Sequence, residues 1–157
     1  MEKFMRLALK QAERAKDIDE VPIGAVIVQG DKIIAKAHNS RNKTQNAINH
    51  AEILAISKAC KQLKSWRLDD CDIYVTLEPC PMCAGAILNA RIKNLYFGAY
   101  DKKTGACSSV FCLSDDVRHN HHLNVQGGFL EKECADLLSS FFKRRRLEKK
   151  IEKRATE

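Results

Sequence analysis

The sequence carries HAEILAISKAC at residues 50–60 and CDIYVTLEPCPMC at residues 71–83, and the rest of the chain is arranged around these two segments. The apolar run over residues 71–77 predicts a buried strand. Pro79 and Pro81 then break the strand where a helix can begin, which places Cys80 and Cys83 three residues apart in its first turn. The two thiols therefore face the same way, at a helix N-terminus whose partial positive charge favours the thiolate form.

His50, Cys80 and Cys83 together offer one imidazole and two thiols, which is a ligand set suited to zinc. Three protein ligands leave a fourth position open, as in catalytic zinc sites. Glu52 lies two residues after His50, so its carboxylate can reach this position and move protons there. The pattern predicts a site that activates water. The alternative interpretation is a capping box between Asn49 and Glu52 beside two ordinary buried thiols.

The length of 157 residues predicts one compact domain with a substantial core. The longest apolar run, IGAVIV at residues 23–28, is too short to cross a bilayer, and the charged N-terminal segment does not resemble a signal peptide. Seven cysteines fit a reduced cytosolic setting better than a disulfide framework. We therefore expect a soluble cytoplasmic protein in which the five other cysteines pack as small apolar residues: Cys60, Cys71, Cys107, Cys112 and Cys134.

The formal net charge of +7 is concentrated at the C-terminus. Residues 143–157 contain eight basic and three acidic residues. A basic segment of this kind commonly indicates a nucleic-acid partner. The alternative interpretation is a solvated helix face that aids solubility.

Hydrophobic periodicity and turn residues predict alternating helices and strands. Residues 23–29 and 32–37 flank a Gly-Asp turn and predict an antiparallel hairpin, whereas the strand, helix and strand within residues 71–98 predict a parallel crossover. The sheet is therefore mixed, and residues 99–122 have no readable period. In chain order the prediction is helix 3–16, strands 23–29 and 32–37, a polar loop 38–48 ending at a cap on Asn49, a helix to about 62, strand 71–77, a helix from the Cys80 region to about 90, strand 93–98, a short strand near 123–126 and a helix from about 130 into the basic segment.

The HxE motif of residues 50–52 followed by the PCxxC motif of residues 79–83 matches the signature of the zinc nucleobase deaminases. Along almost its whole length the sequence resembles the bacterial tRNA-specific adenosine deaminases. The PCxxCAGAI part is shared with guanine and cytosine deaminases, whereas KTGA and FFKRRR are more particular to the tRNA enzymes. The resemblance rests on VPIGAVIV at 21–28, HN at 38–39, HAEI at 50–53, TLEPCPMCAGAI at 76–87, FGAYDKKTGA at 97–106, NH at 120–121 and ECADLLSSFFKRRR at 133–146.

This resemblance implies a cytidine deaminase-like three-layer α/β/α fold with a central mixed five-stranded sheet. Residues 1–157 would form a single deaminase domain whose basic C-terminal helix covers about 130–154. The implied activity is hydrolytic deamination of adenosine to inosine at the wobble position, position 34, of a tRNA anticodon, with an arginine tRNA as the expected substrate. The resemblance also implies one zinc ion per subunit and a homodimer.

The same resemblance implies roles for individual residues. His50, Cys80 and Cys83 match the zinc ligands, and Glu52 matches the proton shuttle. The positions matching substrate contacts are Asn39 at the target nucleoside, Val21 and Asn120 at its pocket, Asp101 and Lys103 on a loop meeting neighbouring anticodon nucleotides, and Phe142, Arg145 and Arg146 on the helix that holds the RNA. From the residues alone, Asn39 and Asp101 could instead cap turns, and Phe142 could belong to the core.

The sequence departs from the family pattern at three places. Asn49 stands where a small residue is common, Tyr100 stands where an Arg is common, and the region of Cys107 and Cys112 is unusual. Two other functions are compatible with the same motif. One is a deaminase of a free base or nucleoside, which needs no basic tail. The other is a zinc-containing RNA-binding module in which Glu52 only caps a helix.

Overall fold

The structure, a computed structural model, describes residues 1–157 and contains one mixed sheet with helices on both of its faces. In chain order the elements are α1 (Glu2–Asp17), β1 (Gly24–Gln29), β2 (Lys32–His38), α2 (Arg41–Thr44), α3 (Ala51–Leu63), β3 (Cys71–Leu77), α4 (Pro81–Asn89), β4 (Asn94–Ala99), the 3-10 turn η1 (Leu113–Asp115), β5 (Asn124–Gln126) and α5 (Glu131–Ala155).

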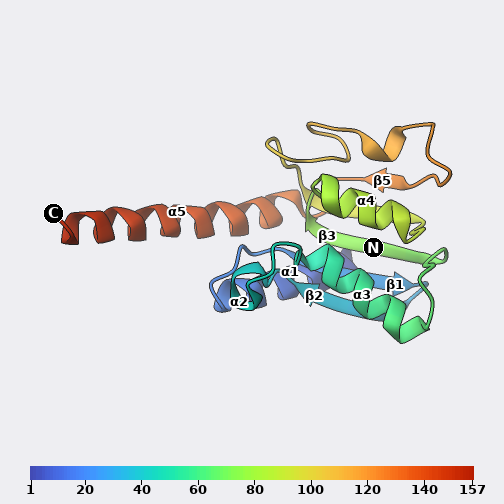
Figure 1. Cartoon of the computed structure of the whole chain (residues 1–157), viewed down its shortest axis with the longest axis horizontal. Helices are drawn as coiled ribbons and strands as arrows, with labels where there is room; N and C mark the ends of the chain where they lie inside the picture. Colours follow the sequence, from blue (N-terminus) through green and yellow to red (C-terminus); the bar gives the residue numbers. More distant parts are fainter.

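The five strands follow the order β2-β1-β3-β4-β5. Figure 1 shows the two edge strands, β2 and β5, on opposite sides of β1 and β3. β1 pairs antiparallel with both β2 and β3, whereas β3 pairs in parallel with β4, and β4 with β5. Because α4 connects β3 to β4, the parallel pair is a strand-helix-strand crossover. The carboxyl end of β3 therefore leads directly into the segment that carries Cys80 and Cys83.

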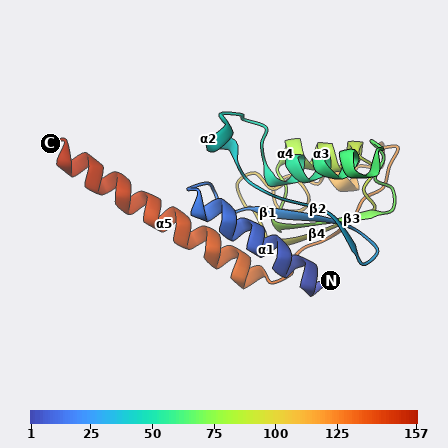
Figure 2. The ribbon, with the colours of Figure 1, turned by 90° about the horizontal axis from the view of Figure 1, so that it is seen from below.

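The sheet lies between two helical layers, with α3 and α4 on one face and α1 and α5 on the other (Figure 2). Side chains alternate along each strand, so each strand supplies both layers. Ile27, Ile73 and Val75 belong to the core beneath α3 and α4. Val26 and Tyr74 belong to the core beneath α1 and α5. This burial on both faces explains why β1 and β3 are mostly apolar rather than alternating.

The mixed five-stranded sheet and its helices confirm the architecture expected from the sequence. Three local expectations were wrong. The loop of residues 38–48 contains the one-turn helix α2, and α3 is capped by His50, because the Asn49 side chain donates instead to Thr44 Oγ1 at 2.8 Å. Cys112 is exposed rather than packed, since its segment lies on the surface and forms only an isolated bridge with Cys107.

The C-terminal helix α5 extends well beyond the sheet (Figure 1). Its first half packs through Cys134, Leu138 and Phe141, which are buried. Its second half carries the basic segment and is exposed. No helix of the chain combines the length and the hydropathy needed to cross a membrane.

Candidate active site

Two helix N-termini meet at the candidate site. His50 is the N-cap of α3 and Cys80 is the N-cap of α4, and both residues have extended backbone. Pro81 occupies the first turn of α4, where its missing N–H costs no intrahelical hydrogen bond. Cys83 lies in the same turn and is buried. The local sequence places each group at a helix N-terminus, and the packing of α3 against α4 brings the imidazole and the two thiols together.

The three side chains lie close enough to share one metal ion, because their potential ligand atoms are all within 4.8 Å of one another. Nδ1 of His50 lies 3.8 Å from the Cys80 sulfur and 3.6 Å from the Cys83 sulfur. In a tetrahedral zinc site, typical bond lengths separate a nitrogen ligand from a sulfur ligand by about 3.5 Å. The donor set and its spacing thus fit a zinc ion with one position left for water or substrate.

In the absence of a metal ion, the side chains of this group shift one another's pKa values. Cys83, through its hydrogen bond to the Cys80 sulfur, and His50 lower the pKa of the Cys80 thiol to about 4. The same contact and burial raise the pKa of Cys83. The hydrogen bond to Cys80 raises the pKa of His50. One thiolate is therefore favoured within the pair, and binding of a divalent cation displaces the remaining proton.

Glu52 lies in the first turn of α3 and is only 4% exposed. Burial raises the pKa of its carboxyl group above the ordinary value, while the charge of His50 opposes this shift. A carboxyl group with a raised pKa next to a metal-ligating residue can accept a proton and return it near neutral pH. The geometry is therefore compatible with a proton-transfer role, and burial of this kind is unusual for a residue that only caps a helix.

Asn39 lies just after β2 and is 6% exposed. Its backbone N–H donates to Ile23 O at 3.0 Å, but its side-chain Oδ1 is buried without a hydrogen-bond partner. An unpaired buried carbonyl oxygen is costly. A ligand that donates a hydrogen bond to Oδ1 would remove this cost, which favours a binding role for Asn39 over a turn cap.

A groove of about 510 Å³ brings together Val21, Asp101, Lys103 and Phe142 from three separate segments. Phe142 is 43% exposed and lines this groove, so it does not belong to the buried core. Leu77 at the end of β3 also lines the groove and lies three residues before Cys80. The groove therefore adjoins the segment that leads to the metal-binding group.

Two arginines of α5 contact the loop between α1 and β1. Arg144 Nη2 and Arg145 Nη1 each lie 3.0 Å from the Asp19 carboxylate. Both guanidinium groups also lie over the ring of Phe141. Asp19 is two residues before Val21, so these contacts hold the start of the basic segment beside the groove. Arg146 is exposed.

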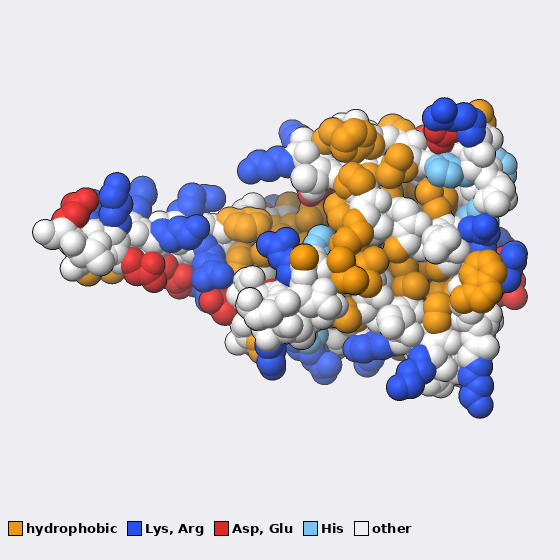
Figure 3. Space-filling model, in the orientation of Figure 1, with side chains coloured by type: hydrophobic (Ala, Val, Ile, Leu, Met, Phe, Trp, Pro, Cys, Tyr) orange, Lys and Arg blue, Asp and Glu red, His pale blue; other side chains and the backbone are white.

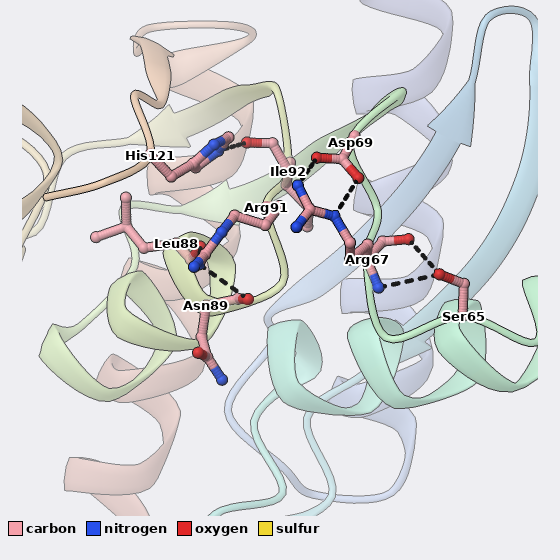
Figure 4. Close-up of polar contacts among 8 residues, drawn as sticks. All are labelled: Ser65, Arg67, Asp69, Leu88, Asn89, Arg91, Ile92 and His121. Atoms are coloured by element: carbon pink, nitrogen blue, oxygen red, sulfur yellow. Dashed lines mark hydrogen bonds and ion pairs between the residues drawn. The ribbon is translucent and has the colours of Figure 1, made fainter.

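Asn120 lies apart from the other predicted site residues. It lines a polar hollow of about 230 Å³ with Arg91, His119 and His121 at the C-terminal end of α4. Figure 4 shows this end of the helix, where Arg91 donates to the carbonyls of Leu88 and Asn89 and the His121 ring contacts the carbonyl of Ile92. The rise of the nine-residue helix α4 places Asn89, which also lines this hollow, about 14 Å along the helix from Cys80.

The sequence did not assign a role to two buried carboxylates. Glu20 is 1% exposed, and its Oε1 accepts the backbone N–H of Lys43 at 2.6 Å. Glu78 is 2% exposed and accepts hydrogen bonds from the loop that carries Asp101. Both residues stand at the edge of an apolar segment of the sequence, and this position was the signal that could have identified them. Acidic residues are seldom buried without specific partners, so an acidic residue next to a buried strand is a candidate for a specific role.

A family model and the similar curated proteins all identify this chain as similar to deaminases. Residues 1–146 match the family described as MafB19-like deaminase. The chain is 48% identical over 149 residues to the tRNA-specific adenosine deaminase of Bacillus subtilis strain 168, covering 95% of this chain and 92% of that protein. It is 49% identical over 153 residues to the tRNA-specific adenosine deaminase of Haemophilus influenzae, covering 97% of this chain and 88% of that protein.

Solved structures agree with these relatives. A structure from a study of A-to-I editing by tRNA A34 deaminases at the wobble position matches with a TM-score of 0.84 and 45% identity, covering 87% of this chain and 99% of that chain. A guanine deaminase from Bacillus subtilis matches with a TM-score of 0.61 and 42% identity, covering 63% of this chain and 64% of that chain. The first match confirms the deaminase fold expected from the sequence.

Proposed function

This chain belongs to the MafB19-like deaminase family and to that of the tRNA-specific adenosine deaminases, and from this premise we propose that it hydrolyses adenosine to inosine at the wobble position of a tRNA anticodon. We propose an arginine tRNA as the substrate, as the resemblance implies. The observation that carries the chemistry is the group of His50, Cys80 and Cys83 with the buried Glu52 two residues from one of its members.

His50, Cys80 and Cys83 would hold one zinc ion per chain. When bound there, zinc supplies a coordinated water whose pKa is lowered toward about 7. Glu52 accepts a proton from the attacking water and delivers it to the purine ring, and it then assists the departure of ammonia. The overall change consumes one water and releases one ammonia. The raised pKa that burial gives Glu52 suits a group that must both accept and donate a proton.

Asn39 is proposed to bind the target nucleoside through its unpaired Oδ1, which accepts a hydrogen bond. Val21 lines the wall of the adjoining groove. An anticodon loop suits such a site, because its bases are single-stranded and can turn out into a pocket without breaking a duplex.

The remaining substrate contacts are proposed for residues along the groove and the basic helix. Asp101 and Lys103 would meet nucleotides next to the target, and Phe142 offers an exposed ring for base stacking. Arg145 and Arg146 would bind phosphates, which supply much of the affinity for nucleic acids. Asn120 is proposed as a further contact, although it lies at the other end of α4.

A homodimer is part of the proposal. Figure 3 shows hydrophobic side chains gathered over the face formed by α3 and α4. Ile48 and Trp66, just before and after α3, are 53% and 61% exposed. An apolar face of this kind is typical of an interface. Light scattering of the purified protein tests the dimer directly. A cytoplasmic location accompanies the proposal, because all seven cysteines are free thiols.

The competing function is deamination of a free base, which the similarity to a guanine deaminase over 63% of this chain supports. The experiment incubates the purified zinc-loaded protein with an arginine tRNA carrying A34, and separately with guanine, cytosine and cytidine. Sequencing of the tRNA should read G at the first anticodon position, with no ammonia released from the free compounds. Turnover of a free base without tRNA editing would overturn the proposed substrate. Absence of ammonia from every substrate would favour a non-catalytic module.

A further inference from the structure

Glu78 is, with Glu20, one of two buried acidic residues that the proposed mechanism does not use. It lies between the end of β3 and Cys80, and it is 2% exposed. Its backbone N–H donates to Ala99 O at 2.8 Å, which continues the pairing of β3 with β4. The side chain therefore leaves the sheet at the same edge as the metal-binding cysteines and points into the loop that follows β4.

That loop surrounds the Glu78 carboxylate with donors. Oε1 accepts the backbone N–H groups of Cys107 at 3.2 Å and Ser109 at 2.8 Å. Oε2 accepts the backbone N–H of Asp101 at 3.0 Å and the hydroxyl of Ser109 at 2.5 Å. All four donors come from residues 101–109. Backbone N–H groups in a sheet or helix donate to backbone carbonyls, but this segment is irregular. The Glu78 carboxylate accepts the hydrogen bonds of these N–H groups instead.

Gly105 shows how tightly the loop encloses the carboxylate. A Cβ atom at this position would lie 2.4 Å from Cδ of Glu78 and 2.5 Å from Asp101 O. The backbone can approach the carboxylate this closely only because residue 105 has no side chain. The loop conformation and the Glu78 side chain therefore depend on each other.

The same loop presents groups to the groove. Asp101 accepts the backbone N–H of Lys103 at 2.9 Å and the hydroxyl of Thr104 at 2.7 Å, so the turn beginning at Asp101 is held from both sides. Asp101, Lys103 and Thr104 line the groove together with Phe142. We infer that Glu78 is a positioning residue that sets the loop of residues 101–109 to select the nucleotide beside the target base. This inference rests on the proposed tRNA-editing function.

The variant Glu78→Gln separates this role from simple filling of space, because it keeps the shape and removes acceptor capacity. An amide offers one oxygen and one NH₂ group. Whichever way the amide is oriented, its NH₂ group faces at least one backbone N–H, of Asp101 or of Cys107 and Ser109. Two hydrogen-bond donors that face each other in a buried site both lack an acceptor. The resulting free-energy cost to the loop conformation is that of a lost hydrogen bond. The loop should therefore loosen while the helices that hold the metal group stay in place.

The experiment compares zinc-loaded wild type and Glu78→Gln on an A34 anticodon stem-loop and on stem-loops substituted at the nucleotide before or after the target. For Glu78→Gln we expect KM on the matched stem-loop to rise about tenfold with kcat within about twofold, and discrimination against the substituted stem-loops to fall about tenfold. Glu13→Gln is the matched control, because Glu13 is an exposed carboxylate on α1. This variant should leave KM and discrimination unchanged. Ser109→Ala removes one donor and should shift KM and discrimination the same way by a smaller factor, which tests the inference even if Glu78→Gln does not fold.

The outcomes are distinguishable. Unchanged discrimination in both variants, or a fall in kcat at constant KM, would overturn the positioning role. A wild type that edits all stem-loops equally would also overturn it. A wild type that edits no stem-loop would overturn the proposed function instead. Zinc content and melting temperature, measured on each variant, show that the metal group and the fold remain.

Discussion

The Arg145 guanidinium lies 3.0 Å from the carboxylate of Asp19, and through this contact the basic helix α5 is attached to the loop that leads into β1. The Asp19 backbone has a φ of 61°, a left-handed conformation that turns the chain sharply after α1. Both side chains are substantially exposed, so the ion pair adds little to stability. Its consequence concerns binding, because the Asp19 carboxylate occupies the two arginines and an RNA phosphate would have to displace it.

Arg145→Ala should weaken binding of the tRNA stem-loop and lower the salt dependence of binding by about one unit of slope, because one phosphate contact is lost. Fluorescence anisotropy over a range of salt concentrations measures both quantities. Zinc content should stay unchanged. An unaltered slope would mean that the basic segment only solvates the helix.

Asp19→Asn should have the opposite effect, since it removes the carboxylate that competes with phosphates for Arg144 and Arg145. The expected gain is an up to about fivefold lower Kd at low salt, in line with the strength of exposed ion pairs. Asp31→Asn is the matched control, because Asp31 pairs with Lys3 at the β-hairpin turn. Equal changes in the two variants would point to net charge alone.

Glu52→Ala should retain zinc and lose at least about 100-fold in kcat, the range expected for removal of a general acid-base group. Because Glu52 is buried and its pKa is raised by burial, loss of the carboxyl group should not lower the melting temperature. Single-turnover editing assays with metal analysis measure the two properties together. Near-normal rates in this variant would exclude a proton-transfer role.

Cys83→Ser should abolish stoichiometric zinc binding, since a sulfur ligand is lost from the first turn of α4. Zinc bound only to the folded state stabilises by about 4 kcal/mol at a thousandfold excess over Kd, so addition of zinc should raise the melting temperature of the metal-free wild type but not of this variant. Cys112→Ser is the control, because Cys112 is an exposed thiol outside the group. Full zinc content in Cys83→Ser would remove Cys83 from the ligand set.

Gly24→Ala should destabilise the fold by about 1–3 kcal/mol, because overpacking of a close-packed contact forces the backbone to shift. The added Cβ would lie 2.0 Å from Ala8 O and 2.5 Å from Ala12 N, where α1 rests directly on β1. Gly85→Ala is the converse control: a Cβ there meets nothing within 4 Å, and alanine favours the helix by about 0.5–1 kcal/mol. Urea unfolding measures the stability of the two variants. An unchanged free energy of unfolding in Gly24→Ala would contradict the close approach of α1 to β1.

Much of the fold could be predicted because its elements have strong local signals. The apolar run of residues 71–77 coincides with β3, and Pro81 begins α4 as expected. Residues 99–122 could not be predicted, because they are held by Glu78 and by isolated backbone contacts rather than by a periodic pattern. The helix α2 also had no apolar period, since it has no buried residue.

The chemistry of the candidate site could be predicted from the residue pattern alone. Local spacing places Glu52 beside His50 on α3 and Cys80 beside Cys83 on α4, and the combined motif predicted that the two pairs share one site although they lie 30 positions apart. Other features depend on three-dimensional packing: Glu78 accepts four hydrogen bonds from residues 101–109, Arg144 contacts Asp19 across 125 positions of the chain, and Asn120 lies at the opposite end of α4 from Cys80. Such contacts arise from the packing of distant segments, and no local period of the sequence encodes them.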